Sequence, residues 1–236
     1  MLIEIGQKAK ETSYILGKMG TDLKNAGLLA AAQEILDEED EILKANAADV
    51  AKAKERGMAP GLVDRLELNH KRIEGIVEGM RQVVGLEDPV GEVISMKRRP
   101  NGLLIGQKRV PFGVIGIIYE ARPNVTADAF ALCFKTGNAV ILRGGSDALE
   151  SNKAIVTAIR NGLKKEGIPE DAISLIEDTS HETAREFMRM NGYLDVLIPR
   201  GGAGLIRTVV ENSTVPVIET GTGNCHIYVD ESADFD

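Results

Sequence analysis

Hydrophobic positions follow two different periods along this chain, and the change of period divides it into regions. Up to residue 87, apolar residues recur every three or four positions, the spacing of amphipathic helices. We expect one apolar face across 27–57 and a second across 62–85, with the Lys- and Glu-rich positions forming a solvated surface. The two predicted faces comprise Leu29, Ile35, Ile42 and Leu43, and then Leu66, Ile73, Ile76, Val77, Met80 and Val83.

The pattern becomes β-like between residues 88 and 112. Two apolar runs flank Pro100-Asn101-Gly102, and Asn-Gly between two strands is a strong hairpin signal. The arms carry five basic residues, which could contact an anion but more often protect an exposed edge strand from aggregation. We favour an extended hairpin that leaves the sheet and serves as an oligomerisation arm. Its basic residues are Lys97, Arg98, Arg99, Lys108 and Arg109.

A strand–helix–strand unit follows at 113–147. Val114 to Tyr119 is an unbroken Val- and Ile-rich run bounded by Gly and Pro, which predicts a strand buried on both faces. A helix capped by Thr126 or Asp128 would run to about 136, and 139–142 forms a second buried strand. A unit this short implies parallel strands and therefore an α/β fold with a right-handed crossover.

Polar residues gather where these predicted strands end, which is where open α/β sheets bind their ligands. Pro123 fixes the local backbone, so Arg122 and Asn124 lie on a rigid loop after the first strand. We treat both side chains as candidates for the active site.

A glycine-rich loop, Arg143-Gly144-Gly145-Ser146, joins the second strand to a helix predicted over 147–166. Free N–H groups at that helix start would favour an anion, the glycines would allow close approach, and Arg143 would supply a positive fork. These features suit a nucleotide phosphate or ribose. The alternative is a tight turn that needs glycine for a positive φ, and from the two glycines alone both interpretations stay open.

A second glycine-rich loop, Arg200-Gly201-Gly202-Ala203-Gly204, lies between a strand predicted at 194–199 and a helix predicted at 205–212. Two such loops are stronger evidence for a nucleotide site than one. Neither is a Walker A loop, because no Gly-Lys-Ser/Thr follows. Beyond them we expect two strands around a glycine-rich turn, with Glu219 as a base, a ribose ligand or a carboxylate bonded to turn amides.

Composition narrows the classes of function. The net charge of -8 argues against nucleic acid or an anionic membrane as the main partner. No apolar run has the length of a membrane span or the form of a signal peptide, so we expect a cytoplasmic protein.

Cys133 and Cys225 are far apart and the three histidines lack ligand spacing, so we expect neither a disulfide nor a metal site. We expect Cys133 to be a core residue. Cys225 and His226, as neighbours on a strand, would point to opposite faces and form no nucleophile–base pair.

The gamma-glutamyl phosphate reductase family, a branch of the aldehyde dehydrogenase superfamily, is the family that this chain resembles. The resemblance covers essentially the whole chain and is carried by YEARPN, by PRGGAGL and by ETGTGNCH. It implies a Rossmann-like three-layer parallel sheet with an N-terminal helical region and a protruding hairpin. It also implies NADPH-dependent reduction of L-glutamyl 5-phosphate to L-glutamate 5-semialdehyde with phosphate release, in proline biosynthesis. A homo-oligomer and a functional link to glutamate 5-kinase would accompany that role.

The resemblance also implies residue roles. Arg143 stands where the superfamily carries a lysine near the adenosine ribose, and Gly144, Gly145 and Ser146 line the same pocket. The turn that meets the pyrophosphate holds Gly201 and Gly202, flanked by Arg200 and Leu205. Arg122 falls at the oxyanion-hole position, where it would bind phosphate or polarise the carbonyl. Glu219 matches a superfamily glutamate, although Thr-Gly-Thr follows it here, and a reductive reaction needs no deacylating water.

The family's nucleophilic cysteine lies downstream of ETGTGNCH, and Cys225 does not match it. We therefore expect an N-terminal portion of a longer enzyme that is inactive alone: helical region 1–87, hairpin 88–112 and NADPH-binding domain 113–236, with the catalytic cysteine domain beyond. Two rival interpretations are a non-catalytic nucleotide- or phosphate-binding module and an oxidative aldehyde dehydrogenase of other specificity.

Overall fold

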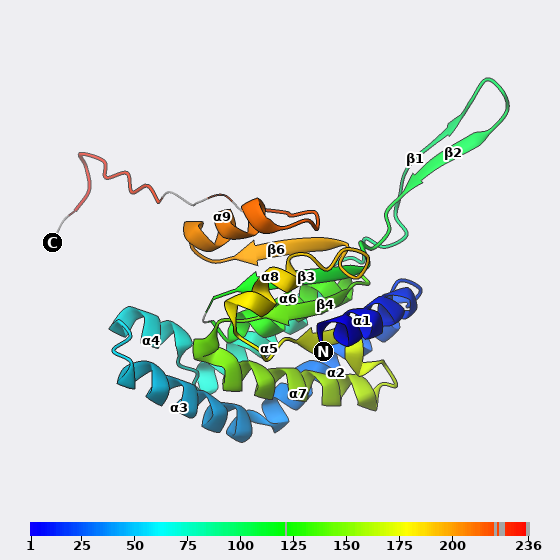
Figure 1. The fold of residues 1–236 in the computed structure, drawn as a ribbon. Coiled ribbons are helices and arrows are strands. Elements are labelled where there is room, and N and C mark those ends of the chain that lie inside the picture. Colours follow the sequence, from blue (N-terminus) through cyan, green and yellow to red (C-terminus); the bar gives the residue numbers. More distant parts are fainter. Residues whose placement is uncertain (121, 220, 222–224, 235–236) are drawn as a thin grey trace.

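A parallel sheet with helices on both faces forms the centre of the computed structural model, which describes residues 1–120, 122–219, 221 and 225–234 (Figure 1). The α/β fold class predicted from the sequence is confirmed. The strands are β1 (Val93–Arg98), β2 (Leu104–Lys108), β3 (Val114–Tyr119), β4 (Ala139–Arg143), β5 (Ile173–Leu175) and β6 (Val196–Arg200). The helices are α1 (Leu2–Leu16), α2 (Thr21–Asp37), α3 (Glu39–Glu55), α4 (Pro60–Leu66), α5 (His70–Gly85), α6 (Asn124–Lys135), α7 (Leu149–Lys165), α8 (His181–Phe187) and α9 (Ala203–Asn212).

The strand order of the main sheet is β5-β4-β3-β6, and all its pairs are parallel. The chain builds outward from β3 through β4 to β5 and then returns to the other side of β3 as β6. Every residue of β3 is buried, as expected for the central strand of a sheet covered on both faces. The reversal of strand order places a topological switch point between β3 and β6, the position at which open α/β sheets bind ligands.

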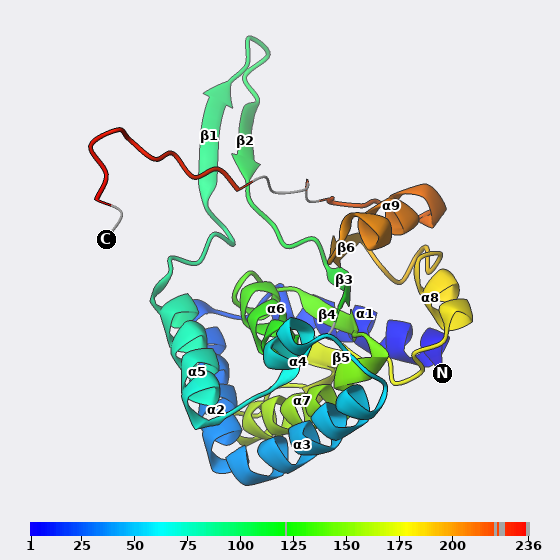
Figure 2. The same ribbon diagram turned by 90° about the vertical axis from the view of Figure 1, so that its left-hand side faces the viewer.

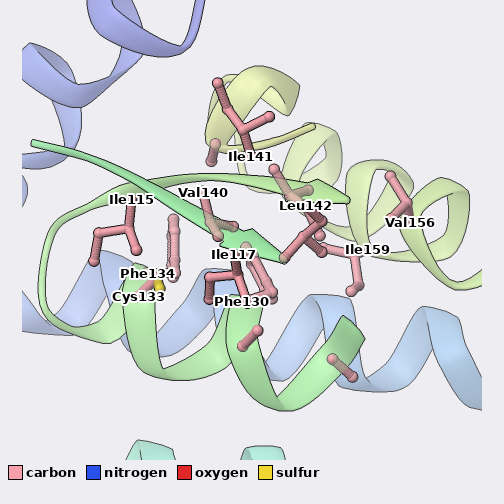
Figure 3. Close-up of a cluster of buried hydrophobic side chains, with 14 of the residues drawn as sticks. Ile115, Ile117, Phe130, Cys133, Phe134, Val140, Ile141, Leu142, Val156 and Ile159 are labelled. Carbon is pink, nitrogen blue, oxygen red and sulfur yellow. The ribbon is translucent and has the colours of Figure 1, made fainter. Parts of the chain in front are cut away.

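Side chains of β3 alternate between two helical layers. Ile115 and Ile117 lie beside Phe130 and Phe134 of α6, whose rings stack with centroids 5.2 Å apart (Figure 3). Gly116 faces the other way, where an added Cβ would come within 2.9 Å of the Phe187 ring of α8. Helices α1 and α8 therefore cover one face of the sheet and α6 and α7 the other, which gives the expected three layers.

The N-terminal helices extend this core. Helix α2 packs on α7 and α5, and α3 packs on α7, so they form an additional layer outside α6 and α7 (Figure 2). Of the first predicted apolar face, Ile35 and Ile42 are buried, but Leu29 is 47% exposed, contrary to the expectation. The stretch 62–85 is two helices rather than one, because the Asn69 side chain accepts a hydrogen bond from the Arg72 N–H and starts α5 anew.

Strands β1 and β2 form the expected antiparallel hairpin, which projects away from the body (Figures 1 and 2). Gly102 in its turn has φ +86°, a conformation that favours glycine. The root of the arm is fixed by Asp88, whose buried carboxylate contacts Lys24 and accepts a hydrogen bond from Thr21. Burial alone would raise the pKa of Asp88, but these hydrogen bonds and one from the Val90 N–H lower it.

Two local predictions are wrong. Helix α6 begins at Asn124 with no side-chain cap, so neither Thr126 nor Asp128 caps it. Thr126 instead lies buried in the first turn and bonds to Tyr119 and Asn152. The two C-terminal strands are also absent from the described residues: Val217 makes one isolated bridge to Leu197, and 225–230 has no regular structure.

Asp195 connects helix α1 to the main sheet. Both of its carboxylate oxygens accept hydrogen bonds from Lys10 Nζ, at 2.7 and 2.8 Å, and one also accepts from the Val114 N–H at 2.8 Å. Gly113 leaves room for this carboxylate, because a Cβ there would lie 2.2 Å from the Asp195 Oδ2 atom. Replacing Gly113 would therefore displace the group that holds α1 against the start of β3.

We predict that Asp195→Ala lowers the free energy of unfolding by about 2 kcal/mol, because charge-assisted hydrogen bonds contribute about 1.5–3 kcal/mol. Urea unfolding measures the loss. Glu4→Ala, which removes an exposed ion pair with Lys8, is the matched control and should change stability little. Equal losses in the two variants would contradict a special role for Asp195.

Candidate functional site

The carboxyl ends of β3, β4 and β6 meet at one edge of the sheet. The parallel register pairs Ile118 with Arg143 and Tyr119 with Arg200, so both glycine-rich loops and the loop after β3 emerge side by side. The edge therefore contains the candidate residues that the sequence placed after these three strands.

Arg143, the last residue of β4, is half-buried, and its guanidinium already bonds to backbone groups of the protein. Its Nη2 atom donates to the carbonyl oxygens of Thr179 at 2.6 Å and Ser180 at 3.2 Å, while its Nε atom is buried without a partner in the described structure. Burial lowers the pKa of Arg143, and the nearby Asp178 carboxylate partly offsets this effect. The guanidinium is thus held in place by the loop before α8, which limits where its remaining N–H groups can point.

Close packing, rather than backbone conformation, requires one glycine in each loop, Gly144 in the first and Gly201 in the second. Gly145 and Gly202 have φ of -67° and -68°, and neither Gly144 nor Gly201 has a positive φ. The alternative of turns that need a positive φ is therefore wrong. At Gly144 an added Cβ would lie 2.5 Å from the Asn152 Nδ2 atom and 3.2 Å from the Tyr119 ring.

The start of α7 is not the free anion site that the sequence suggested. Asp49, a buried residue of α3, accepts hydrogen bonds from the Ser151 N–H at 2.8 Å, the Ser151 hydroxyl at 2.7 Å and the Glu150 N–H at 3.4 Å. A carboxylate at this position satisfies first-turn donors and complements the helix dipole. A ligand at this loop would therefore have to use Arg143, Ser146 or backbone groups before Glu150.

The turn before α9 holds a carboxylate as well, but that carboxylate is exposed. Glu120, which follows β3 directly, accepts a hydrogen bond through Oε1 from the Gly202 N–H at 3.1 Å. A Cβ on Gly201 would meet the Glu120 carboxyl carbon at 2.7 Å and the Leu205 side chain at 2.8 Å. The turn is therefore shaped to take an anionic oxygen, and Glu120 supplies one.

Arg122 and Asn124 lie where the sequence placed them, after β3. Arg122 is exposed, and its backbone N–H donates to the Glu120 carbonyl at 2.8 Å. Asn124 begins α6 and donates to Asp128 at 3.2 Å. Burial raises the pKa of Asp128, against the lowering effects of the Asn124 hydrogen bond and the Arg200 charge.

Glu219 lies in a hollow of about 290 Å³ that is lined mostly by residues of α9. Its side chain is exposed, and the described residues include no hydrogen bond between it and Arg122 or Asn124. The three candidates for supporting catalytic roles are therefore not brought into direct contact. The hollow is lined by Ala203, Ile206, Arg207, Val210, Glu211, Glu219 and Gly221.

A buried polar chain lies behind this edge and was not identified from the sequence. Tyr119 Oη and Thr126 Oγ1 are 2.7 Å apart, and Thr126 donates to Asn152 Oδ1 at 2.8 Å. Burial raises the pKa of Tyr119, so its hydroxyl stays neutral. Asn152 Nδ2 is buried without a partner in the described structure. The chain fixes the ends of β3 and α6 to α7, and therefore positions the loops that follow.

Neither cysteine has the surroundings of an activated nucleophile. Cys133 is in the core, where burial raises its pKa to about 12. Cys225 is exposed in a segment without regular structure, so the strand geometry that separated it from His226 in the sequence argument does not apply.

Within the described residues there is no cluster of His, Cys, Asp or Glu suited to a metal. No helix among them could cross a membrane.

Sequence reasoning missed Glu120 and Asp49 for different reasons. Glu120 directly follows a buried strand, so the rule that selected Arg122 could have selected it too. Asp49 is one acidic residue among many on a helix 102 positions before Ser151, and no local signal marks it as a cap.

Comparison with known proteins identifies the family of this edge. The model of the aldehyde dehydrogenase family matches residues 3–236. The chain belongs to the aldehyde dehydrogenase family. The parallel sheet, its covering helices and the protruding hairpin are the architecture expected from the resemblance.

Close relatives are proteins named gamma-glutamyl phosphate reductase. The chain is 61% identical over 231 residues to the one from Heliobacterium modesticaldum and 58% identical over 234 residues to the one from Clostridium botulinum. These alignments cover 98% and 99% of this chain but only 55% and 56% of the relatives. The chain therefore spans about half the length of the curated relatives that it matches.

Solved structures of proteins with the same name have the same fold as this chain. The gamma-glutamyl phosphate reductase of Thermotoga maritima superposes with a TM-score of 0.93 at 52% identity, covering 99% of this chain and 56% of that one. The Saccharomyces cerevisiae enzyme of the same name gives 0.85 at 30% identity, covering 91% and 54%. These matches confirm the resemblance to the gamma-glutamyl phosphate reductase branch of this aldehyde dehydrogenase family.

Proposed function

We propose that this chain is the cofactor-binding part of an enzyme that reduces L-glutamyl 5-phosphate to L-glutamate 5-semialdehyde with NADPH and releases phosphate, a step of proline biosynthesis. The observation that carries the proposal is identity of 58–61% to gamma-glutamyl phosphate reductases over nearly the whole chain. The geometry supports a nicotinamide dinucleotide, because the two glycine-rich loops follow β4 and β6, the strands on either side of β3, at the sheet edge that contains the switch point.

One turn in particular supports an anionic cofactor. The Gly202 N–H at the start of α9 donates to a carboxylate oxygen, and a phosphate oxygen could accept the same hydrogen bond. We assign Gly201, Gly202, Arg200 and Leu205 to the diphosphate end of the cofactor. Arg143, with Gly144, Gly145 and Ser146, would hold the adenosine ribose and its 2′-phosphate, because a guanidinium pairs well with phosphate oxygens.

The remaining roles concern the acyl phosphate. The cofactor would supply a hydride to the acyl carbon. Arg122, on the loop at the switch point, and Asn124, at the start of α6, would bind the phosphate or polarise the carbonyl, because a guanidinium and an amide offer N–H donors to these oxygens. Glu219 would line the approach along α9. A cytoplasmic location and a functional link to glutamate 5-kinase follow from this reaction and belong to the same proposal.

The cofactor assignment predicts a ligand-dependent rise in thermal stability. NADPH should stabilise this chain progressively, by about 2.7 kcal/mol at 100 times Kd, and inorganic phosphate should not reproduce the effect.

Arg143→Ala should weaken NADPH binding about tenfold and NADH binding much less, because only NADPH carries the 2′-phosphate. The ratio of the two affinities removes any general loss caused by breaking the contacts to Thr179 and Ser180.

Arg81→Ala, which removes an exposed arginine of helix α5, is the matched control. It should leave both affinities unchanged. Equal losses for NADPH and NADH in Arg143→Ala would remove the 2′-phosphate contact from the proposal. No stabilisation by any dinucleotide would oppose the assignment of this edge as a cofactor site in the chain as it stands.

We also propose that the hairpin of β1 and β2 mediates homo-oligomerisation. Its large apolar side chains are 50–59% exposed, and an apolar patch on a projecting arm is typical of an interaction site. The register pairs Met96 with Gly106 and Arg98 with Leu104, so Met96 and Leu104 share one face of the hairpin. The exposed apolar residues are Val93, Ile94, Met96, Leu103, Leu104 and Ile105.

The double substitution Met96→Glu/Leu104→Glu should shift the oligomer toward monomer, because two buried charges at an apolar interface are costly. Multi-angle light scattering measures the mass. Ser95→Glu/Gln107→Glu, which adds the same charge to the opposite face, should keep the larger assembly. If both double variants retain the wild-type mass, the hairpin is not the interface.

A further inference from the structure

The carboxylate of Glu120 lies at the mouth of the switch point between β3 and β6. Glu120 follows β3, and its backbone N–H donates to the carbonyl of Arg200 at the end of β6. Its side chain then crosses to the turn before α9, where Oε1 accepts from the Gly202 N–H at 3.1 Å. The carboxyl carbon lies 2.7 Å from where a Cβ of Gly201 would be. The absence of a side chain at Gly201 therefore makes room for Glu120.

This carboxylate lacks the partners that would make it a purely structural group. Glu120 is exposed, and its only side-chain hydrogen bond among the described residues is the one to Gly202. Among the described residues Glu120 forms no ion pair, although Arg122 and Arg200 lie on the same edge of the sheet. Asp49 provides the contrast, because its buried carboxylate accepts three hydrogen bonds at the start of α7.

The two glycine-rich loops therefore differ in what could release their carboxylates. Withdrawing Asp49 would leave buried donors on Ser151 without partners, which is costly. Withdrawing Glu120 would expose only the Gly202 N–H, to water or to a ligand. A rotation of an exposed glutamate side chain is fast and needs no backbone change. Only the turn before α9 thus holds a carboxylate that can leave without damage to the fold.

We propose that Glu120 is a built-in competitor of the cofactor: its carboxylate occupies the turn before α9 in the free protein and must swing away when a diphosphate group binds there. This inference rests on the proposed cofactor site and adds a residue that sets its affinity. A carboxylate and a phosphate oxygen cannot share the Gly202 N–H, because like charges at such a distance repel. The binding energy of the cofactor is thus reduced by the cost of displacing Glu120.

The decisive variant is Glu120→Gln, which keeps the shape of the side chain and its ability to accept from Gly202 but removes the charge. Neutralising one charge at a helix N-terminus should tighten the binding of inorganic pyrophosphate and of NADPH by about three- to tenfold. Affinities come from thermal-shift titrations and from isothermal calorimetry on the same chain. Glu186→Gln, an exposed glutamate on α8, makes the same change in net charge and should alter neither affinity.

The outcomes separate this inference from the proposed function. Tighter binding of pyrophosphate by Glu120→Gln, with no binding of NADPH to any variant, would support the competitor role and oppose the cofactor assignment. Binding of NADPH with equal affinity to wild type and Glu120→Gln would support the cofactor assignment and overturn the competitor role. Weaker binding by Glu120→Gln would also overturn it, because the carboxylate would then be a ligand contact. Thermal unfolding without ligand shows whether the variant is folded.

Discussion

Parallel hydrogen bonding of β3 to β4 on one side and to β6 on the other is the constraint on which the remainder of the structure depends. Because β3 is buried along its whole length, it must be flanked by strands and covered by helices on both faces. Parallel neighbours then force every strand to end at the same edge. The loops that carry Glu120, Arg143 and Gly201 are therefore neighbours although they are far apart in sequence.

The N-terminal helices hold both ends of this sheet. Asp49 of α3 caps α7 near the site edge, and at the opposite end Asp195 ties α1 to the start of β3 through Lys10. Asn46, another buried residue of α3, donates to Ser151 and to the carbonyl of Leu66. The helical region thus contributes polar groups to the core of the α/β part, and one hydrophobic core extends from α1 to the segment after α9.

The sequence predicted the elements whose signal is local. The apolar run of β3, the Asn101-Gly102 turn and the glycine-rich loops are each readable within a few residues, and all lie where expected. Contacts between distant segments were not predictable, because the partner of Asp49 lies 102 positions away and Thr126 proved to be a buried network residue rather than a cap. The C-terminal strands failed for the same reason, since a β-run forms a strand only when a neighbour pairs with it.

The central claim is that the edge formed by β3, β4 and β6 binds the diphosphate and ribose of a nicotinamide dinucleotide. Amide hydrogen exchange with and without NADPH tests it directly. The account predicts added protection at Gly201, Gly202 and the residues around Arg143, and none at Thr136 and Asn138 near the opposite end of the strands. Protection confined to that opposite end, or to the hairpin, would contradict it.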